Sequence, residues 1–164
     1  MNNEKNYLEL DHEYYLHAYN RFPVVLSRGK GSRVWDEQGR EYIDAMAGIA
    51  VNSIGHAHPE LVAAIHEQAQ KLIHISNFYL SKPQAMLSQK LAKLTGLHRV
   101  FFANSGAEAN EGAIKIARKY GHHYKRGGTI LSFSGCFHGR TLGTIATGKP
   151  EMQEGFDPIP GGFK

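Results

Sequence analysis

Residues 100–121 read VFFANSGAEANEGAIKIARKYG and form the clearest secondary-structure unit in the sequence. It begins with an apolar run, Val100 to Ala103, that predicts a short buried strand. Asn104-Ser105-Gly106 then turns the chain into a helix that we expect to end at Gly121, with its apolar residues on one face. Ser105 and Glu108 have the spacing of a capping box at the start of this helix.

A second apolar run, Thr129 to Phe133, follows the helix and predicts another strand. Strand, helix and strand in this order form a βαβ unit, which places the two strands parallel in one sheet. The sequence therefore predicts an α/β fold. The upstream elements that we expect are a helix over 8–20, a hairpin over 33–44 with Gly39 in its turn, a loop or strand over 45–53, and helices over 59–73 and 83–96.

Composition is that of an ordinary globular protein, with 41% hydrophobic and 21% charged residues in a chain of 164. The single cysteine excludes an internal disulfide and favours a reducing compartment. The N-terminus has no apolar segment of the signal-peptide kind, and the run Ala45 to Val51 is much shorter than the roughly 20 residues of a membrane helix. We therefore expect a cytoplasmic protein that does not enter a membrane.

The net charge is +4, and the excess is local. Between Lys90 and Arg126 there are eight Lys and Arg against two Glu. A basic surface can bind nucleic acid, but no recognition motif or ladder of aromatic residues accompanies it. A solvated helix face, or attraction for a small anionic ligand, is the preferred interpretation, and a nucleic-acid binder is the weaker alternative.

The helix that begins at Ser105-Gly106 is a candidate phosphate site, because free backbone N–H groups and the helix dipole both favour an anion there. Ser105 adds a hydroxyl, and Gly106 lets a ligand approach the backbone. A plain N-cap with a tight turn explains the same two residues equally well. No P-loop motif is present, and Gly29 to Val34 lacks the third glycine of a dinucleotide loop.

The stretch CFHGRT at 136–141 follows the second predicted strand, at the edge where α/β proteins bind ligands. The ring of Phe137 and the imidazole of His138 could lie on a flat cofactor, and the guanidinium of Arg140 could bind a carboxylate. A loop with one packed Phe and one surface Arg is the alternative. We predict no metal site, because His56 and His58 have no third ligand at close spacing, and we expect Cys136 to be an apolar filler.

Taken together, NSGAEANE at 104–111, KIAR at 115–118 and FHGRT at 137–141 resemble the class III pyridoxal-phosphate aminotransferases. The segments AGIAVN at 47–52 and GHAHP at 55–59 are similar to the acetylornithine branch of this family. The resemblance implies the N-terminal part of a fold-type I transferase. Residues 1–58 would then belong to a small α+β domain, and residues 59–164 would begin the parallel-sheet large domain.

The resemblance also implies a role for each matching residue. Ser105, Gly106 and Ala107 would hold the phosphate of pyridoxal 5'-phosphate, and Phe137 would stack on its ring. Arg140 would bind the α-carboxylate of the substrate. Gly48 takes the place of a tyrosine that meets the free α-amine in ornithine aminotransferases, so it would leave room for an acylated amine.

The implied reaction transfers the terminal amine of N-acetylornithine to 2-oxoglutarate, as in arginine biosynthesis, in a homodimer. Ornithine, succinylornithine, succinyldiaminopimelate and 4-aminobutyrate are alternative substrates of the same class. In this family the Schiff-base lysine lies far downstream, so we expect it beyond Lys164 and predict that residues 1–164 are a fragment without catalytic activity. A non-catalytic phosphate-binding module is the alternative from another class of protein.

Overall fold

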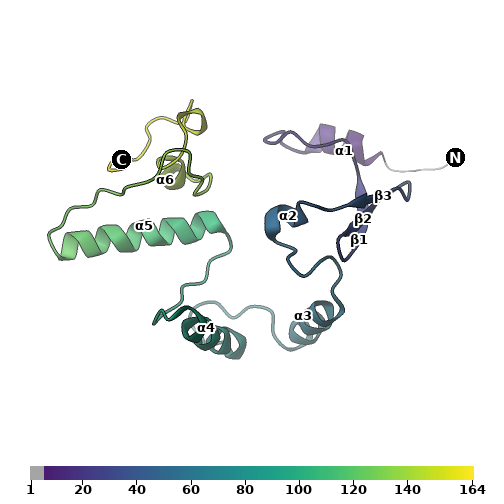
Figure 1. Cartoon of the computed structure of the whole chain (residues 1–164), viewed down its shortest axis with the longest axis horizontal. Helices are drawn as coiled ribbons and strands as arrows, with labels where there is room; N and C mark the ends of the chain where they lie inside the picture. Colours follow the sequence, from purple (N-terminus) through teal and green to yellow (C-terminus); the bar gives the residue numbers. More distant parts are fainter. Residues whose placement is uncertain (1–5) are drawn as a thin grey trace. The chain divides into compact units, whose positions relative to one another are not determined.

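The computed structural model describes residues 6–164, whose elements are labelled in Figure 1. The chain divides into two compact units, Met1–Tyr79 and Leu80–Lys164. The domain boundary implied by the family resemblance, between residues 58 and 59, remains a prediction. Of the helices in the described part of the chain, none is both long enough and apolar enough to cross a bilayer.

The first unit contains a three-stranded antiparallel sheet in the order β1–β2–β3. The strands span Leu26–Lys30, Arg33–Asp36 and Glu41–Ile43. The predicted hairpin is confirmed, and Gly39 occupies its turn with φ of +78°. β1 lies outside the sequence prediction, because its residues, LSRGK, carry little strand signal and become a strand by pairing with β2.

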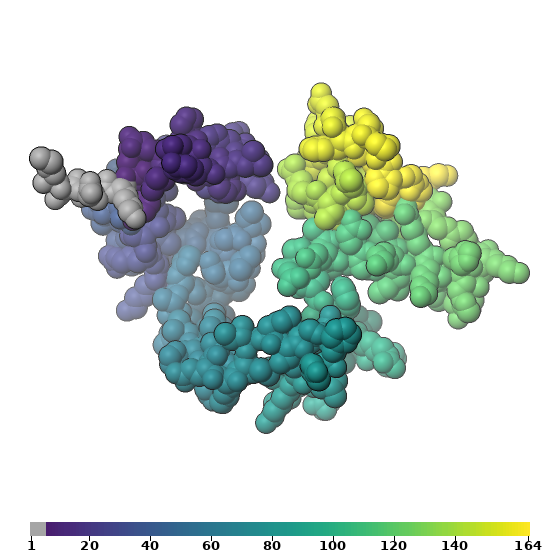
Figure 2. All heavy atoms as spheres, turned by 180° about the vertical axis from the view of Figure 1, so that it is seen from behind, coloured from purple at the N-terminus to yellow at the C-terminus, as the bar shows by residue number. Residues whose placement is uncertain are grey.

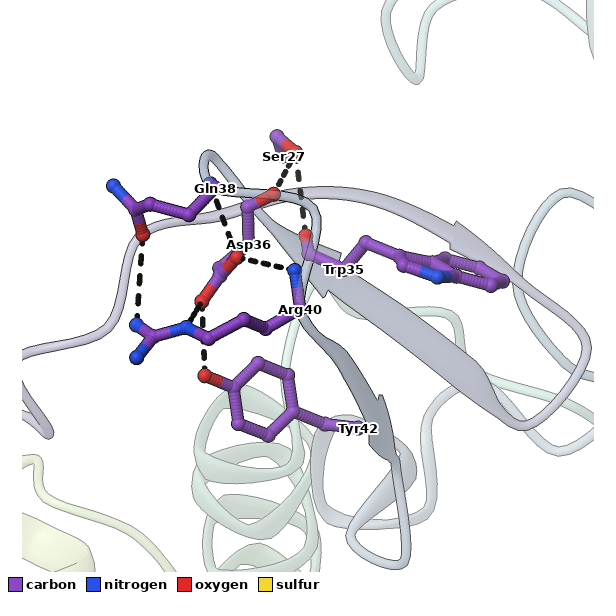
Figure 3. Close-up of polar contacts among 6 residues, drawn as sticks. All are labelled: Ser27, Trp35, Asp36, Gln38, Arg40 and Tyr42. Atoms are coloured by element: carbon purple, nitrogen blue, oxygen red, sulfur yellow. Dashed lines mark hydrogen bonds and ion pairs between the residues drawn. The ribbon is translucent and has the colours of Figure 1, made fainter.

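Asp36, at the end of β2, organises the hairpin with a carboxylate that is fully buried (Figure 3). One carboxylate oxygen accepts hydrogen bonds from the backbone N–H groups of Gln38 and Arg40 at 3.0 and 2.8 Å. The other accepts from Nε of Arg40 at 2.6 Å and from the hydroxyl of Tyr42 at 2.9 Å. Ser27 of β1 donates to the backbone oxygen of Asp36 at 3.1 Å. Asp36 thus links all three strands.

Acid is expected to weaken the first unit through Asp36. Desolvation raises the pKa of this carboxyl, but the hydrogen bonds from Arg40 and Tyr42 lower it by more, so its pKa lies below the ordinary value. A depressed folded-state pKa contributes stability above the unfolded pKa of about 4, and this stability is lost as pH falls through the folded pKa. Thermal melts of the complete protein from pH 6 to pH 3 should show a steeper loss for the wild type than for Asp36→Asn. Glu37→Gln, at the exposed neighbouring position, should melt like the wild type; equal slopes for the wild type and Asp36→Asn would contradict the assignment.

Two N-terminal segments differ from expectation. α1 spans Tyr7–Tyr14 and ends six residues before the predicted end, because Tyr15 already has extended backbone angles. Residues 45–53 form a loop that contains one tight turn, α2, at Ala47–Ala50, and the backbone of this turn is left-handed, with positive φ at all four residues. The carboxylate of Asp44 accepts from the N–H groups of Met46 and Ala47 at 3.1 and 2.8 Å, which starts this turn.

The longer helices follow their sequence signals closely. α3 spans Pro59–Lys71 and begins with its proline, as predicted. α4 spans Lys82–Thr95 and ends at Gly96, which adopts the left-handed conformation of a helix C-terminus. α5 spans Gly106–His123, two residues beyond the predicted end. Two short pieces follow it: α6 at Leu142–Ile145 and the 3₁₀ helix η1 at Pro150–Met152.

The two strands predicted on either side of α5 do not form within residues 6–164. Val100 to Ala103 has no partner strand there, and Thr129 to Phe133 makes a single parallel bridge, from Ile130 to Phe163. An apolar run becomes a strand only when a neighbour takes up its backbone hydrogen bonds, so the predicted βαβ pairing is wrong for the described residues. Phe101 and Phe133 accordingly remain 67% and 90% exposed.

The C-terminal residues are bound to other parts of the second unit. Ile130 donates to the oxygen of Gly162 at 2.9 Å and accepts from the N–H of Lys164 at 2.9 Å. Arg118 of α5 donates to the oxygen of Gly161 at 2.7 Å and lies 4.6 Å from the ring centre of Phe163. In Figure 2 the yellow C-terminal residues lie against the green residues of the same unit.

Candidate functional site

The N-terminus of α5 presents unused backbone donors. Ser105 is its N-cap, and the Ser105 hydroxyl accepts from the N–H of Glu108 at 3.2 Å. The Glu108 carboxylate accepts from Asn104, not from Ser105, so only half of the predicted capping box forms. Among the described residues no acceptor pairs with the N–H groups of Gly106 and Ala107. These two groups can therefore bind an anion.

The loop that carries Phe137 to Thr141 lies directly against the first turns of α5. At Gly139 a Cβ would lie 2.6 Å from Cβ of Ala107, and φ is +134°, so this close approach requires glycine. One residue earlier, the oxygen of His138 accepts from Nδ2 of Asn110 at 2.9 Å. One helical turn of α5 thus positions the loop.

The helix N-terminus and the loop enclose a cavity of about 350 Å³. Its lining contains five of the predicted site residues: Gly106, Ala107, Phe137, His138 and Arg140. Asn110 and Gly139 complete the lining, and sequence reasoning missed both. Asn110 could have been found from its spacing, because it lies three residues after Ala107 and so on the same helix face.

Two predicted site residues lie outside this lining. Ser105 is adjacent to Gly106, where it caps the helix. Gly48 belongs to α2 in the first unit, with φ of +64°. Their proposed roles toward a ligand remain predictions.

His138 and Cys136 are both held by Thr147, which lies two residues after the end of α6. Nδ1 of His138 lies 2.9 Å from the hydroxyl of Thr147, and Sγ of Cys136 donates to the oxygen of Thr147 at 3.0 Å. Thr147 is buried, with 6% of its surface exposed. The Cys136 thiol is therefore engaged with the backbone, which agrees with a structural role for this residue.

Phe137 and Arg140 leave their functional groups accessible. The Phe137 ring is 61% exposed, and the Arg140 guanidinium lies 5.8 Å from its centre. No carboxylate in the described part of the chain pairs with Arg140. A flat ring against Phe137 and a carboxylate at Arg140 fit this arrangement, together with a phosphate at the N–H groups of Gly106 and Ala107. A phosphorylated aromatic cofactor would fit the site, since its phosphate could bind the N–H donors and its ring could lie against Phe137.

A second cavity, of about 460 Å³, lies in the first unit, where His56, His58 and Arg33 contribute to its lining. Nε2 of His56 lies 2.7 Å from the carboxylate of Asp44, a hydrogen bond that lowers the pKa of Asp44. Arg33 pairs with Glu41. No group of three metal-ligating side chains occurs among the described residues. Nδ1 of His58 is the buried side-chain atom without a hydrogen-bond partner in the described part of the chain. The α5 cavity is the better candidate site, because its lining joins free backbone N–H groups, an aromatic ring and a guanidinium.

Comparison with known proteins shows which family the chain is similar to. A sequence model of the family described as aminotransferase class-III matches residues 14–164. The chain is similar to a protein named acetylornithine aminotransferase from Methanocaldococcus jannaschii, with 54% identity over 98% of this chain and 41% of the relative. It is also similar to a protein of the same name from Methanothermobacter thermautotrophicus, with 52% identity over 96% of this chain and 40% of the relative. The chain thus spans about two fifths of the length of these curated relatives.

The chain is also similar to solved structures of aminotransferases. The ornithine aminotransferase of Toxoplasma gondii superimposes with a TM-score of 0.91 at 32% identity, covering 100% of this chain and 40% of that one. The N-acetylornithine aminotransferase of Stenotrophomonas maltophilia superimposes with a TM-score of 0.72 at 45% identity, covering 87% of this chain and 37% of that one.

Proposed function

Because the chain belongs to the class III aminotransferase family, we propose that it forms the part of such an enzyme that binds the cofactor phosphate. Its fold is the predicted one, that of the N-terminal part of a fold-type I transferase. The proposed reaction moves the terminal amino group of N-acetylornithine to 2-oxoglutarate, a step of arginine biosynthesis. The observation that carries the proposal is the single cavity that joins Gly106, Phe137 and Arg140.

Class III aminotransferases use pyridoxal 5'-phosphate, which supplies an electron sink at the carbon that carries the amine. The N–H groups of Gly106 and Ala107 would hold the cofactor phosphate, with Ser105 fixing the helix end. The Phe137 ring, with His138 beside it, would fix the plane of the cofactor. No lysine lines the cavity within the described residues, so we propose that the covalent anchor of the cofactor comes from elsewhere in the enzyme.

Arg140 would bind the substrate α-carboxylate, because a guanidinium can pair with both carboxylate oxygens. This contact would direct the distant terminal amine toward the cofactor. Gly48, which has no side chain, would leave space for an N-acyl group. Ornithine, succinylornithine, succinyldiaminopimelate and 4-aminobutyrate are the competing amino donors.

We further propose a homodimer in the cytoplasm, with residues 1–58 in the small domain and residues 59–164 in the large domain. The family resemblance supports the dimer and the domains. The single cysteine, which is free, supports a reducing compartment. We propose neither a nucleic-acid nor a membrane partner.

The test is an absorbance spectrum of the complete natural protein, before and after addition of N-acetylornithine without an acceptor. We expect a visible cofactor band that bleaches with N-acetylornithine and returns with 2-oxoglutarate, and that bleaches more slowly with ornithine. A band that responds to ornithine or 4-aminobutyrate alone would assign another amino donor. No band after addition of pyridoxal 5'-phosphate would favour a non-catalytic phosphate-binding module.

Gly106→Asp is expected to weaken the binding of pyridoxal 5'-phosphate by roughly 10-fold, since it places a carboxylate beside the proposed phosphate site. A Cβ at Gly106 meets no atom within 4 Å, so the effect is one of charge and not of space. Aspartate in the first helical turn favours the helix itself, so the thermal midpoint of the cofactor-free protein should stay the same or rise. Gly106→Asn, the uncharged variant of equal size, should bind within about 2-fold of the wild type. Equal affinities for the Asp and Asn variants would place the phosphate elsewhere.

A further inference from the structure

The two halves of the proposed site come from separate segments of the second unit. The anion donors belong to α5, whereas Phe137 and Arg140 belong to a loop without regular structure that ends where α6 begins. α6 lies close to α5 (Figure 1). In the proposed site, α5 binds the phosphate end of the cofactor and the loop contacts the cofactor ring. The distance between α5 and the loop must therefore be fixed.

Asn110 provides one link between the halves. Its Nδ2 donates to the oxygen of Gly106 at 3.0 Å and to the oxygen of His138 at 2.9 Å. Both amide protons are therefore used, one on the phosphate-binding turn and one on the loop, between Phe137 and Gly139. A side chain with this double contact sets how far the loop lies from the turn.

Glu111, the next residue of α5, provides a second link. Its carboxylate accepts from the hydroxyl of Thr141, which is the N-cap of α6. A Cβ on Gly143 would lie 2.5 Å from Oε1 of Glu111, so this glycine admits the carboxylate next to the α6 backbone. Thr144 of α6 is fully buried, so Thr141 is tied to a packed element.

We propose that Asn110 and Glu111 form a clamp that positions the Phe137–Arg140 loop against the phosphate-binding end of α5. The inference rests on the proposed function. Neither residue is assigned a step in the reaction. Asn110 positions Phe137 and, through it, the cofactor ring. Glu111 holds Thr141 and so positions the adjacent Arg140, which binds the substrate carboxylate.

The clamp predicts that binding of the phosphate and binding of the whole cofactor respond differently to substitution. In the complete protein, Asn110→Ala should leave the affinity for inorganic phosphate within about 2-fold, since the N–H donors of Gly106 and Ala107 remain. It should weaken pyridoxal 5'-phosphate by roughly 10-fold, the value of one hydrogen bond, and reduce the visible circular dichroism of the bound cofactor.

Glu111→Ala should raise KM for the amino donor by roughly 10-fold while kcat changes little. Glu111→Gln retains an accepting oxygen for Thr141 and should restore KM to within about 3-fold of the wild type. Lys119→Ala, at an exposed position of the same helix, is the control and should match the wild type in every measurement.

Three outcomes would overturn the clamp. They are unchanged cofactor affinity and KM in the alanine variants, equal loss of phosphate and cofactor affinity in Asn110→Ala, and no recovery in Glu111→Gln. If Asn110→Ala does not fold, the pair Glu111→Ala and Glu111→Gln decides the question. A wild-type protein without a visible cofactor band would overturn both the proposed function and the clamp, whereas a band with unaffected variants would overturn the clamp alone.

Discussion

Gly139→Ala is expected to lower the affinity for pyridoxal 5'-phosphate by about 100-fold. The new methyl group would lie 2.6 Å from Cβ of Ala107 and 2.8 Å from the hydroxyl of Thr144, so the loop would have to move away from α5. The backbone also adopts φ of +134°, which L side chains rarely occupy. Strain and overpacking each cost about 1–3 kcal/mol, and every 1.4 kcal/mol is about one factor of ten.

The matched control for this substitution is Gly135→Ala in the same loop region. Gly135 also has positive φ, +75°, but a Cβ there meets no atom within 4 Å. This variant carries the backbone strain without the collision with α5. Cofactor titration of both variants, with thermal melts in parallel, separates the two effects. Similar cofactor affinities for the two variants would show that close contact between loop and helix does not shape the site.

Arg140→Ala is expected to lower kcat/KM for N-acetylornithine by about 100-fold, with most of the change in KM. A charge-assisted pair between guanidinium and carboxylate contributes about 2–3 kcal/mol when it is shielded from water by a bound substrate. Arg140 has no carboxylate partner in the described part of the chain, so its removal leaves no internal charge unpaired. The folded stability should therefore hardly change. Stopped-flow bleaching of the cofactor band measures this half-reaction directly.

The assignment of Arg140 to the α-carboxylate has a specific control. N-acetyl-1,4-diaminobutane has the same terminal amine as N-acetylornithine but lacks the carboxylate. Arg140→Ala should react with it as the wild type does, whereas Arg126→Ala, at an exposed position of the same unit, should match the wild type with both donors. An equal loss of rate for both donors in Arg140→Ala would assign this arginine a role other than carboxylate binding.

Much of the local structure could be predicted because its causes are local. The proline at position 59 begins α3, the glycine at 96 ends α4, and Ser105 caps α5. The Gly39 turn closes the hairpin between β2 and β3. In each case a few neighbouring residues contain the full physical requirement, whether a hydrogen-bond acceptor for a helix end or a backbone able to adopt positive φ.

The candidate site was predictable only in part. Gly106, Phe137 and Arg140 carry chemistry that can be recognised in the sequence, and the structure brings them to one cavity. Gly139 carries no such signal, and Asn110 has only its spacing, three residues after Ala107 on the same helix face. Their importance arises from a hydrogen bond between residues 28 positions apart and from a close approach to Ala107. Both are facts of packing that no short stretch of sequence contains.

Local sequence signals were enough to predict α3, α4, α5, the β2–β3 hairpin and the candidate anion-binding turn at Ser105-Gly106, since hydrophobic period, capping and turn chemistry act within a few residues. Which apolar runs become strands depends on the rest of the fold: Val100 to Ala103 finds no partner among residues 6–164, and Ile130 pairs with Phe163. The position of the loop at 137–141 against α5 likewise depends on tertiary contacts. Strand pairing and loop position depend on groups distant in the chain, whose hydrogen bonds and contacts exist only once the chain has folded.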